Sequence, residues 1–99
     1  MTGSVTVQSI VVAVKDQVSS DVGGEAVILH MQSGIYYGLD PVGARIWSLV
    51  QQPKRVADLR EAVVDEFDVE PARCETDLIE LLQKLLTEGL IELQDVRQS

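Results

Sequence analysis

The apolar residues of the chain change their spacing at Asp40-Pro41. Before this point they form short runs rich in β-branched and aromatic residues, at 10–14, 26–29 and 35–39, which are typical of β-strands. After it they recur every three or four residues, which is the spacing of one face of an α-helix. Because strands come first and helices follow, the sequence predicts an α+β domain.

Three strands are predicted in the first part of the chain. They cover residues 10–14, a segment from 26 that reaches Met31, and residues 35–39. The dipeptide Ser33-Gly34 favours a tight turn, so the second and third strands are expected to pair as a hairpin. Residues 16–24 are polar and end in Gly23-Gly24, which predicts a loop.

The helices begin where Asp40 precedes Pro41. An aspartate at the N-cap accepts free backbone N–H groups, and a proline at the first helical position loses no hydrogen bond. Three helices are predicted, from Pro41 to before Pro53, from 56 to 67 and from Pro71 to before Gly89, and then a short strand at 90–93. The predicted fold is a winged helix-turn-helix-like single domain, 1–99, with a three-stranded antiparallel sheet followed by three helices and a core over about 10–93.

Length and charge narrow the class of protein. The 99 residues allow one domain, and a hydrophobic content of 45% predicts a packed core. The net charge of −8 repels phosphate backbones, which disfavours nucleic acid as a partner. The sequence shows no signal peptide and no run of about twenty apolar residues that would cross a bilayer. Because its single cysteine, Cys74, forms no internal disulfide, we expect a cytoplasmic protein with no membrane partner.

The predicted third helix carries a wide apolar face. One stripe contains Cys74, Leu78, Leu81 and Leu85, and next to it lie Ile79, Leu82 and Leu86. Two interpretations stay open: all of these side chains pack on the other helices, or some of them border a groove for a partner. In the second case, a charge at Leu78 or Leu82 is expected to weaken partner binding without unfolding the domain.

Residues for catalysis are missing from the sequence. His30 is the only histidine and lies in a predicted strand, where a structural role is expected. Cys74 lies on the apolar stripe, where a buried and unreactive thiol is expected. The acidic residues lack the spacing of a calcium loop, and Gly23-Gly24 lacks the other residues of a phosphate-binding loop. The sequence therefore predicts no enzyme, no metal site and no cofactor.

Three segments, taken in their order and spacing, resemble the PqqD-like family, also called RiPP recognition elements (RiPPs are ribosomally made, post-translationally modified peptides). They are MQSGIYYGLD at 31–40, VGARIW at 42–47, and the closing helix with its glycine and strand at 77–91. The resemblance covers roughly residues 10–93. Within the family, the aromatic strand followed by Gly-Ala-Arg-Ile-Trp is most similar to the discrete leader-binding protein of lasso-peptide systems.

The resemblance implies a non-catalytic function. A precursor's leader segment would add as an extended strand beside the predicted third strand and lie along the third helix. The implied binding residues are Ile35, Tyr36, Tyr37, Gly38 and Leu39 on the strand, and Cys74, Asp77, Leu78, Leu81, Leu82 and Leu85 on the helix. The implied partners are the precursor leader peptide, a leader peptidase and an ATP-dependent lasso cyclase.

Several residue roles stay open at this level. Tyr36 and Tyr37 point to opposite faces of their strand, so one packs inward and the other can meet a ligand. Gly38 either admits a second backbone or marks a bulge at the strand end. Asp77 either pairs with a basic leader residue or lies on the exposed flank, and Trp47 is expected in the core.

Other functions also stay open. A winged-helix DNA-binding regulator has the same order of elements, but its recognition helix is basic. The predicted third helix instead opposes two basic residues to four acidic ones, Arg73 and Lys84 to Glu75, Asp77, Glu80 and Glu88. A PqqD-type chaperone of pyrroloquinoline quinone biosynthesis and a dimerisation module that uses an open sheet edge are the remaining alternatives.

Overall fold

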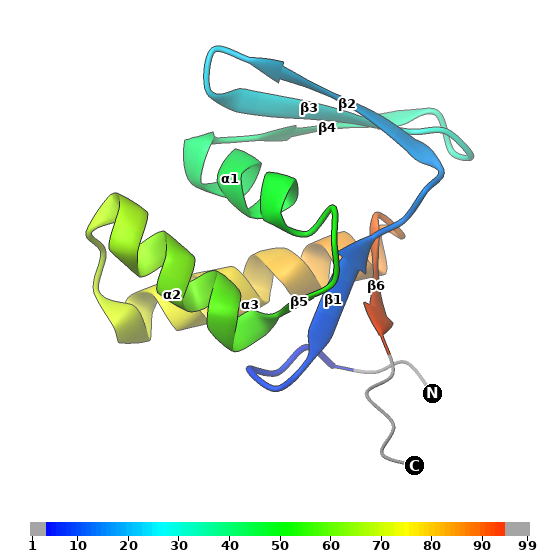
Figure 1. The fold of residues 1–99 in the computed structure, drawn as a ribbon. Coiled ribbons are helices and arrows are strands. Elements are labelled where there is room, and N and C mark those ends of the chain that lie inside the picture. Colours follow the sequence, from blue (N-terminus) through cyan, green and yellow to red (C-terminus); the bar gives the residue numbers. More distant parts are fainter. Residues whose placement is uncertain (1–3, 95–99) are drawn as a thin grey trace.

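The computed structural model describes residues 4–94 of the chain. In chain order the elements are β1 (Ile10–Ala13), β2 (Gln17–Val22), β3 (Glu25–His30), β4 (Ile35–Leu39), α1 (Pro41–Leu49), β5 (Lys54–Arg55), α2 (Val56–Phe67), α3 (Pro71–Thr87) and β6 (Ile91–Gln94). Figure 1 shows α1 between the layer of β2, β3 and β4 on one side and the helices α2 and α3 on the other. The predicted fold class, an α+β domain with a three-stranded antiparallel sheet and three helices, is confirmed.

The antiparallel sheet has the strand order β2-β3-β4, so β3 is central and both β2 and β4 are edge strands. The predicted hairpin of β3 and β4 is confirmed, with His30 opposite Ile35 and Ala26 opposite Leu39. In its turn, Gly34 has a φ of 72°, a left-handed conformation that glycine adopts without strain. Within residues 4–94 no further strand pairs with β2 or β4, so each leaves one row of backbone groups unpaired.

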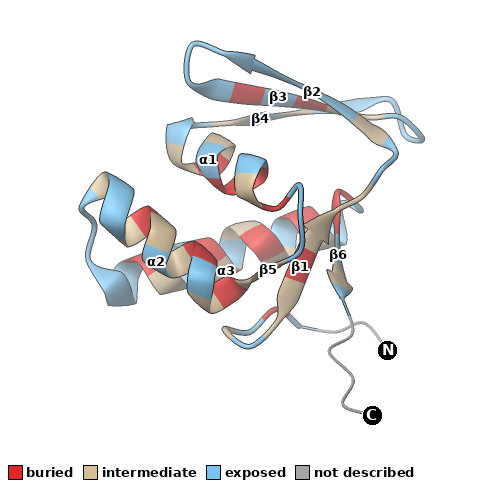
Figure 2. Cartoon of the chain, in the orientation of Figure 1, coloured by how far each residue is buried: buried red, intermediate tan, exposed pale blue. Residues whose placement is uncertain are grey.

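The expectation that residues 16–24 form a loop is wrong, because Gln17–Val22 forms β2. Almost all of this edge strand is exposed, and Figure 2 shows it mostly in pale blue. An edge strand without a buried face has no need of alternating apolar residues, so the usual sequence signal is absent. Gly23 and Gly24, with φ values of 62° and 87°, form a two-residue hairpin turn between β2 and β3.

A second, smaller sheet has the order β5-β1-β6. The predicted strand at 10–14 is therefore present as β1, but it belongs to this smaller sheet. In the larger sheet, β2 pairs with β3 where the strand at 10–14 was expected. The predicted strand at the end of the chain is confirmed as β6, which pairs with β1 from Ile10↔Gln94 to Ala13↔Ile91. The two-residue strand β5 has no signal in the sequence. Since β1 lies between segments that are distant in the chain, local patterns do not reveal its partners.

The start of α1 is held directly against the end of β4. As predicted, Asp40 is the N-cap, and its Oδ1 accepts a hydrogen bond of 2.8 Å from the Gly43 N–H. A Cβ on Gly43 would lie 3.2 Å from the Leu39 Cβ, so a larger residue at 43 would push the helix away from the strand. Trp47, on the same helix, is 3% exposed and belongs to the core, as expected.

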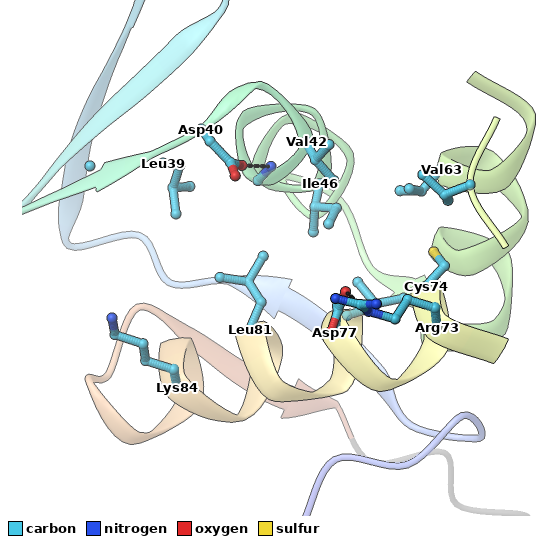
Figure 3. Close-up of a pocket in the computed structure, with 14 residues that line it drawn as sticks. Leu39, Asp40, Val42, Ile46, Val63, Arg73, Cys74, Asp77, Leu81 and Lys84 are labelled. Atoms are coloured by element: carbon cyan, nitrogen blue, oxygen red, sulfur yellow. Dashed lines mark hydrogen bonds and ion pairs between the residues drawn. The ribbon is translucent and has the colours of Figure 1, made fainter. Parts of the chain in front are cut away.

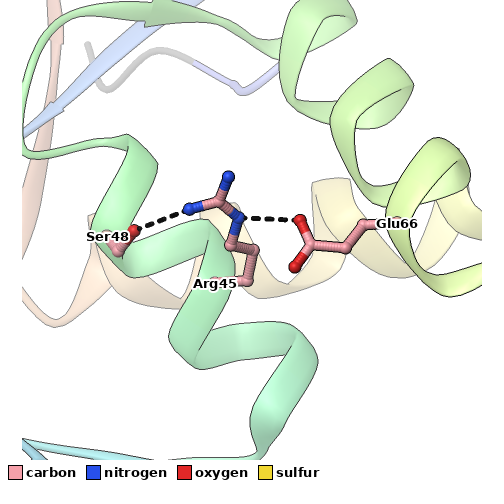
Figure 4. A network of polar contacts seen from close by, with 3 residues as sticks. All are labelled: Arg45, Ser48 and Glu66. Carbon is pink, nitrogen blue, oxygen red and sulfur yellow. Dashed lines mark hydrogen bonds and ion pairs between the residues drawn. The ribbon is translucent and has the colours of Figure 1, made fainter. Parts of the chain in front are cut away.

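Two ion pairs connect the helices at the surface. The Arg45 Nε donates to Glu66 Oε1 at 2.8 Å between α1 and α2, and Arg45 Nη1 also donates to Ser48 Oγ (Figure 4). Arg60 and Glu75 make a 2.6 Å contact between α2 and α3. Exposed pairs of this kind contribute about 0.2–1 kcal/mol each, so the helices are held mainly by their buried apolar faces. No helix in the described part of the chain is long and apolar enough to span a membrane.

Candidate functional site

The direction of the backbone groups in β3 shows which residues of β4 are unpaired. The Met31 N–H donates to the Asp16 oxygen at 3.0 Å, on the β2 side of β3, and the Gly34 N–H donates to the His30 oxygen at 2.8 Å, on the β4 side. In an antiparallel sheet these directions alternate along a strand. The even-numbered residues of β3 therefore bond to β4, and the odd-numbered ones bond to β2.

The register then assigns the groups of β4. Residues Ile35, Tyr37 and Leu39 lie opposite even-numbered residues of β3, so their N–H and C=O groups face β3. The N–H and C=O groups of Tyr36 and Gly38 face the other way, toward the open edge. Gly38 has open space where a Cβ would stand and no positive φ, so the chain's own packing does not require glycine there.

The open edge of β4 borders two adjoining hollows, which together we call the β4–α3 cleft. The larger has a volume of about 600 Å³ and the smaller about 270 Å³, and both touch Gly38, Leu39, Leu81 and Lys84. Figure 3 shows the larger one between the end of β4 and α1 above and α3 below, with Val63 of α2 at its far end. Its apolar lining comes from all of these elements and from the segment between α2 and α3: Leu39, Val42, Ile46, Val63, Val69, Leu78 and Leu81.

Helix α3 carries two adjoining stripes of residues. The stripe of Cys74, Leu78, Leu82 and Leu85 is buried in the core, and Cys74, Leu78 and Leu85 of this buried stripe also reach the walls of the hollows. A second stripe at helical spacing, Asp77, Leu81, Lys84 and Glu88, borders the β4–α3 cleft. Leu82 is 0% exposed and lines neither hollow, so we leave it out of the candidate site. Since Leu78 is only 2% exposed, the expectation that a charge at Leu78 or Leu82 leaves the fold intact does not fit this burial.

The two tyrosines of β4 take different positions. Tyr36 is 68% exposed, whereas Tyr37 is partly buried and packs against the core. The Tyr37 hydroxyl donates a 2.8 Å hydrogen bond to Glu88 Oε1 and so connects β4 to the end of α3. This hydrogen bond, followed by partial desolvation and the negative charge of Glu88, raises the pKa of the Tyr37 phenol above its usual value. Tyr37 is thus the tyrosine that packs inward.

Most polar groups around the cleft already have partners. Asp77 lies 3.4 Å from the Arg73 Nε, on an exposed part of α3. Among residues 4–94, Lys84 makes no ion pair. Burial, and secondly the charge of Asp77, raise the pKa of the Cys74 thiol, so it is neutral at physiological pH and adds apolar lining.

The structure brings most of the predicted binding residues together around the β4–α3 cleft. Ile35 is the exception on the strand, since it is 50% exposed and lines neither hollow. The sequence did not single out Val42 and Ile46, because their i, i+4 spacing in α1 is the same as that of core residues. The sequence did contain a signal for Lys84, because this residue follows the predicted binding residue Leu81 by three positions and so lies on the same helix face.

Comparisons with protein families and with solved structures each found a match to this chain. The family model described as "Coenzyme PQQ synthesis protein D (PqqD)" matches residues 25–91, more than half of the chain. The chain belongs to the PqqD family. The range matched to PqqD contains β3, β4 and all three helices, and so includes every element that lines the cleft. The family predicted from the sequence is confirmed.

A solved structure is similar to this PqqD-family chain over most of its length. It is described as "TbiB1 in Complex with the TbiA(beta) Leader Peptide", and it matches with a TM-score of 0.75 and 36% sequence identity. The match covers 88% of this chain and 99% of that one. Among curated proteins, no sequence matches.

Proposed function

We propose that this chain binds the leader segment of a ribosomally synthesised precursor peptide and catalyses no reaction itself. One observation carries the proposal: the unpaired edge of β4 opens directly onto an apolar cleft. An extended peptide can add to such an edge, with backbone hydrogen bonds for affinity and pockets for alternate side chains. The similarity to TbiB1, which was solved in complex with a leader peptide, supports a leader peptide as the ligand.

In this proposal the leader pairs with the outward N–H and C=O groups of Tyr36 and Gly38. Every second side chain of the leader then points toward α3, because side chains alternate along a strand. These inward side chains would fill the β4–α3 cleft, whose larger hollow of about 600 Å³ accepts large apolar groups. We propose that Leu39 on β4 and Leu81 on α3 make apolar contacts with these inward side chains of the leader.

The captured precursor would next be delivered to the enzymes that process it. We propose a leader peptidase and, for a lasso-peptide system, an ATP-dependent cyclase as partners, all in the cytoplasm. Holding the leader on this domain raises the effective concentration of the precursor near an enzyme that also binds the domain. A site without chemistry of its own is sufficient for this function.

Titration with the leader peptide encoded beside this gene tests the proposal. We expect saturable binding with a dissociation constant in the micromolar range or below, measured by fluorescence anisotropy, because about −8 kcal/mol supports a useful encounter. No binding at roughly tens of micromolar peptide would contradict the proposal.

Hydrogen exchange tests the mode of binding. The amide protons of Tyr36 and Gly38 have no partner inside the sheet, so we expect their exchange to slow when the peptide binds. The Ser19 amide, which by the same alternation faces the open edge of β2, is the internal control and should not change. Protection at Ser19 instead of Gly38 would show that the peptide binds at the β2 edge, which would contradict the proposed mode of binding.

A further inference from the structure

We propose that the bound strand places a carboxylate side chain against the ammonium group of Lys84, so that this chain selects an acidic residue at one inward position of its leader. The inference rests on the proposed function and specifies the chemistry of its ligand. Lys84 lines both hollows of the β4–α3 cleft, as do Gly38, Leu39 and Leu81, and these residues therefore border the junction of the two hollows. Figure 3 shows its side chain extending from α3 toward the side of the cleft that β4 forms.

The other charged groups that line the cleft are engaged. Asp77 pairs with Arg73 at 3.4 Å, Glu88 accepts the Tyr37 hydroxyl at 2.8 Å, and Asp40 accepts the Gly43 N–H at 2.8 Å. Lys84 makes no such contact with any residue between 4 and 94. Asp40 and Glu88 keep their negative charges, but among the described residues Lys84 is the charged lining side chain whose hydrogen-bonding group is free to pair with an incoming strand.

When a peptide strand docks on β4, the Lys84 ammonium group favours an acidic side chain at the facing position. A strand along β4 removes water from the apolar cleft, and a charge that loses water without gaining a partner is costly. A carboxylate on the strand offsets that cost by a charge-assisted hydrogen bond. The net charge of −8 acts in the opposite direction over long range, since it favours basic peptides. An acidic preference at one position would thus be a local effect of Lys84.

The spacing of the strand predicts a short pattern. Inward side chains are two residues apart, or about 7 Å along the strand. A carboxylate at the junction therefore places the inward side chain two residues away beside the larger, apolar hollow. We expect an acidic residue separated by one position from a large apolar residue.

Selection from a displayed library of random peptides tests this pattern even while the natural precursor is unidentified. The library is selected in parallel on the wild-type protein and on Lys84→Glu. The wild type should enrich the acidic residue beside the apolar one, and Lys84→Glu should enrich lysine or arginine at the same position. Lys15→Glu is the matched control, because it makes the same change in net charge at an exposed residue that lines neither hollow.

Titration of one enriched peptide gives the size of the effect. Exchange of its carboxylate for the amide should weaken binding to the wild type by about 1.5–5-fold, the range of an exposed ion pair, and should leave binding to Lys84→Met unchanged. The same preference on the wild type and on Lys84→Glu would overturn this inference alone. A wild type that enriches no peptide, or only peptides that bind Gly38→Pro equally well, would overturn the proposed function.

Discussion

The sheet of β2, β3 and β4 has two open edges, and they differ in what lies beside them. At the β4 edge, α3 and the start of α1 form the cleft that Leu81 and Leu39 line. At the β2 edge, no residue of the strand lines either hollow, and five of its six residues are exposed. Both edges offer unpaired backbone groups, but only one offers a wall for side chains. An open edge alone therefore offers only backbone pairing, and a helix beside it is needed to distinguish one side chain from another.

The side chains of the two edges are consistent with this difference. Natural proteins protect open edges from unwanted pairing with polar or charged residues. The β2 strand carries Ser19, Ser20 and Asp21, which make it a poor template for another strand. The β4 strand carries Ile35, Tyr36 and Gly38 in their place. In this respect β4 is the less protected edge.

The largest predicted effect separates the wall of the cleft from the core behind it. Leu82→Asp places a carboxylate among fully buried residues and should unfold the domain, since truncation to alanine alone costs about 2–5 kcal/mol. Leu81→Asp, at its partly exposed neighbour, should stay folded and lose leader binding by more than about tenfold. Circular dichroism melts and anisotropy titrations measure the two outcomes. If both variants unfold, Leu81 belongs to the core and not to the wall.

The second prediction compares the edges directly. Gly38→Pro and Ser19→Pro each remove one outward N–H, on β4 and β2, and proline is tolerated at such edge positions. Gly38→Pro should reduce leader affinity by about tenfold, because it loses a backbone hydrogen bond and crowds the incoming strand. Ser19→Pro should bind like the wild type. Equal losses, measured by anisotropy on folded protein, would show that the two edges do not differ in function.

The third prediction concerns the contact that connects β4 to α3. Glu88 raises the pKa of the Tyr37 phenol by accepting its hydrogen bond and by its negative charge. Glu88→Gln should therefore lower that pKa toward the usual value near 10.0. The measurement is an ultraviolet absorbance titration in a Tyr36→Phe background, so that only Tyr37 contributes. An unchanged titration curve would mean that Glu88 does not contact Tyr37 in solution.

The smallest effect is expected for Gly38→Ala. A Cβ at this position meets no atom within 4 Å, and Gly38 has no positive φ. Since alanine loses less conformational freedom on folding than glycine, the free energy of unfolding should rise by about 0.5–1 kcal/mol. Denaturant titration measures the change. A loss of stability would indicate a strained backbone at this edge.

The hairpin and helices were predictable because their signals are local. Asp40 and Pro41 define a helix start by groups only a few residues apart, and the Ser33-Gly34 turn sets the pairing of its own two strands. The strand at β2 was missed because both of its faces are exposed, although Gly23-Gly24 was a usable turn signal. The partners of β1 could not be read, since β5 and β6 come from distant parts of the chain.

By itself, the sequence determined the α+β class, the positions of the three helices, the β3–β4 hairpin and the family resemblance, because each depends on residue types at short spacing. Only the tertiary structure decided that Leu82 of α3 is core while its neighbour Leu81 lines the cleft, and which tyrosine packs inward. Leu81 and Leu82 are adjacent and chemically identical, so periodicity alone treats both as apolar positions. Their difference arises from what packs against each face of the helix, and that depends on the positions of β4 and α1 in space.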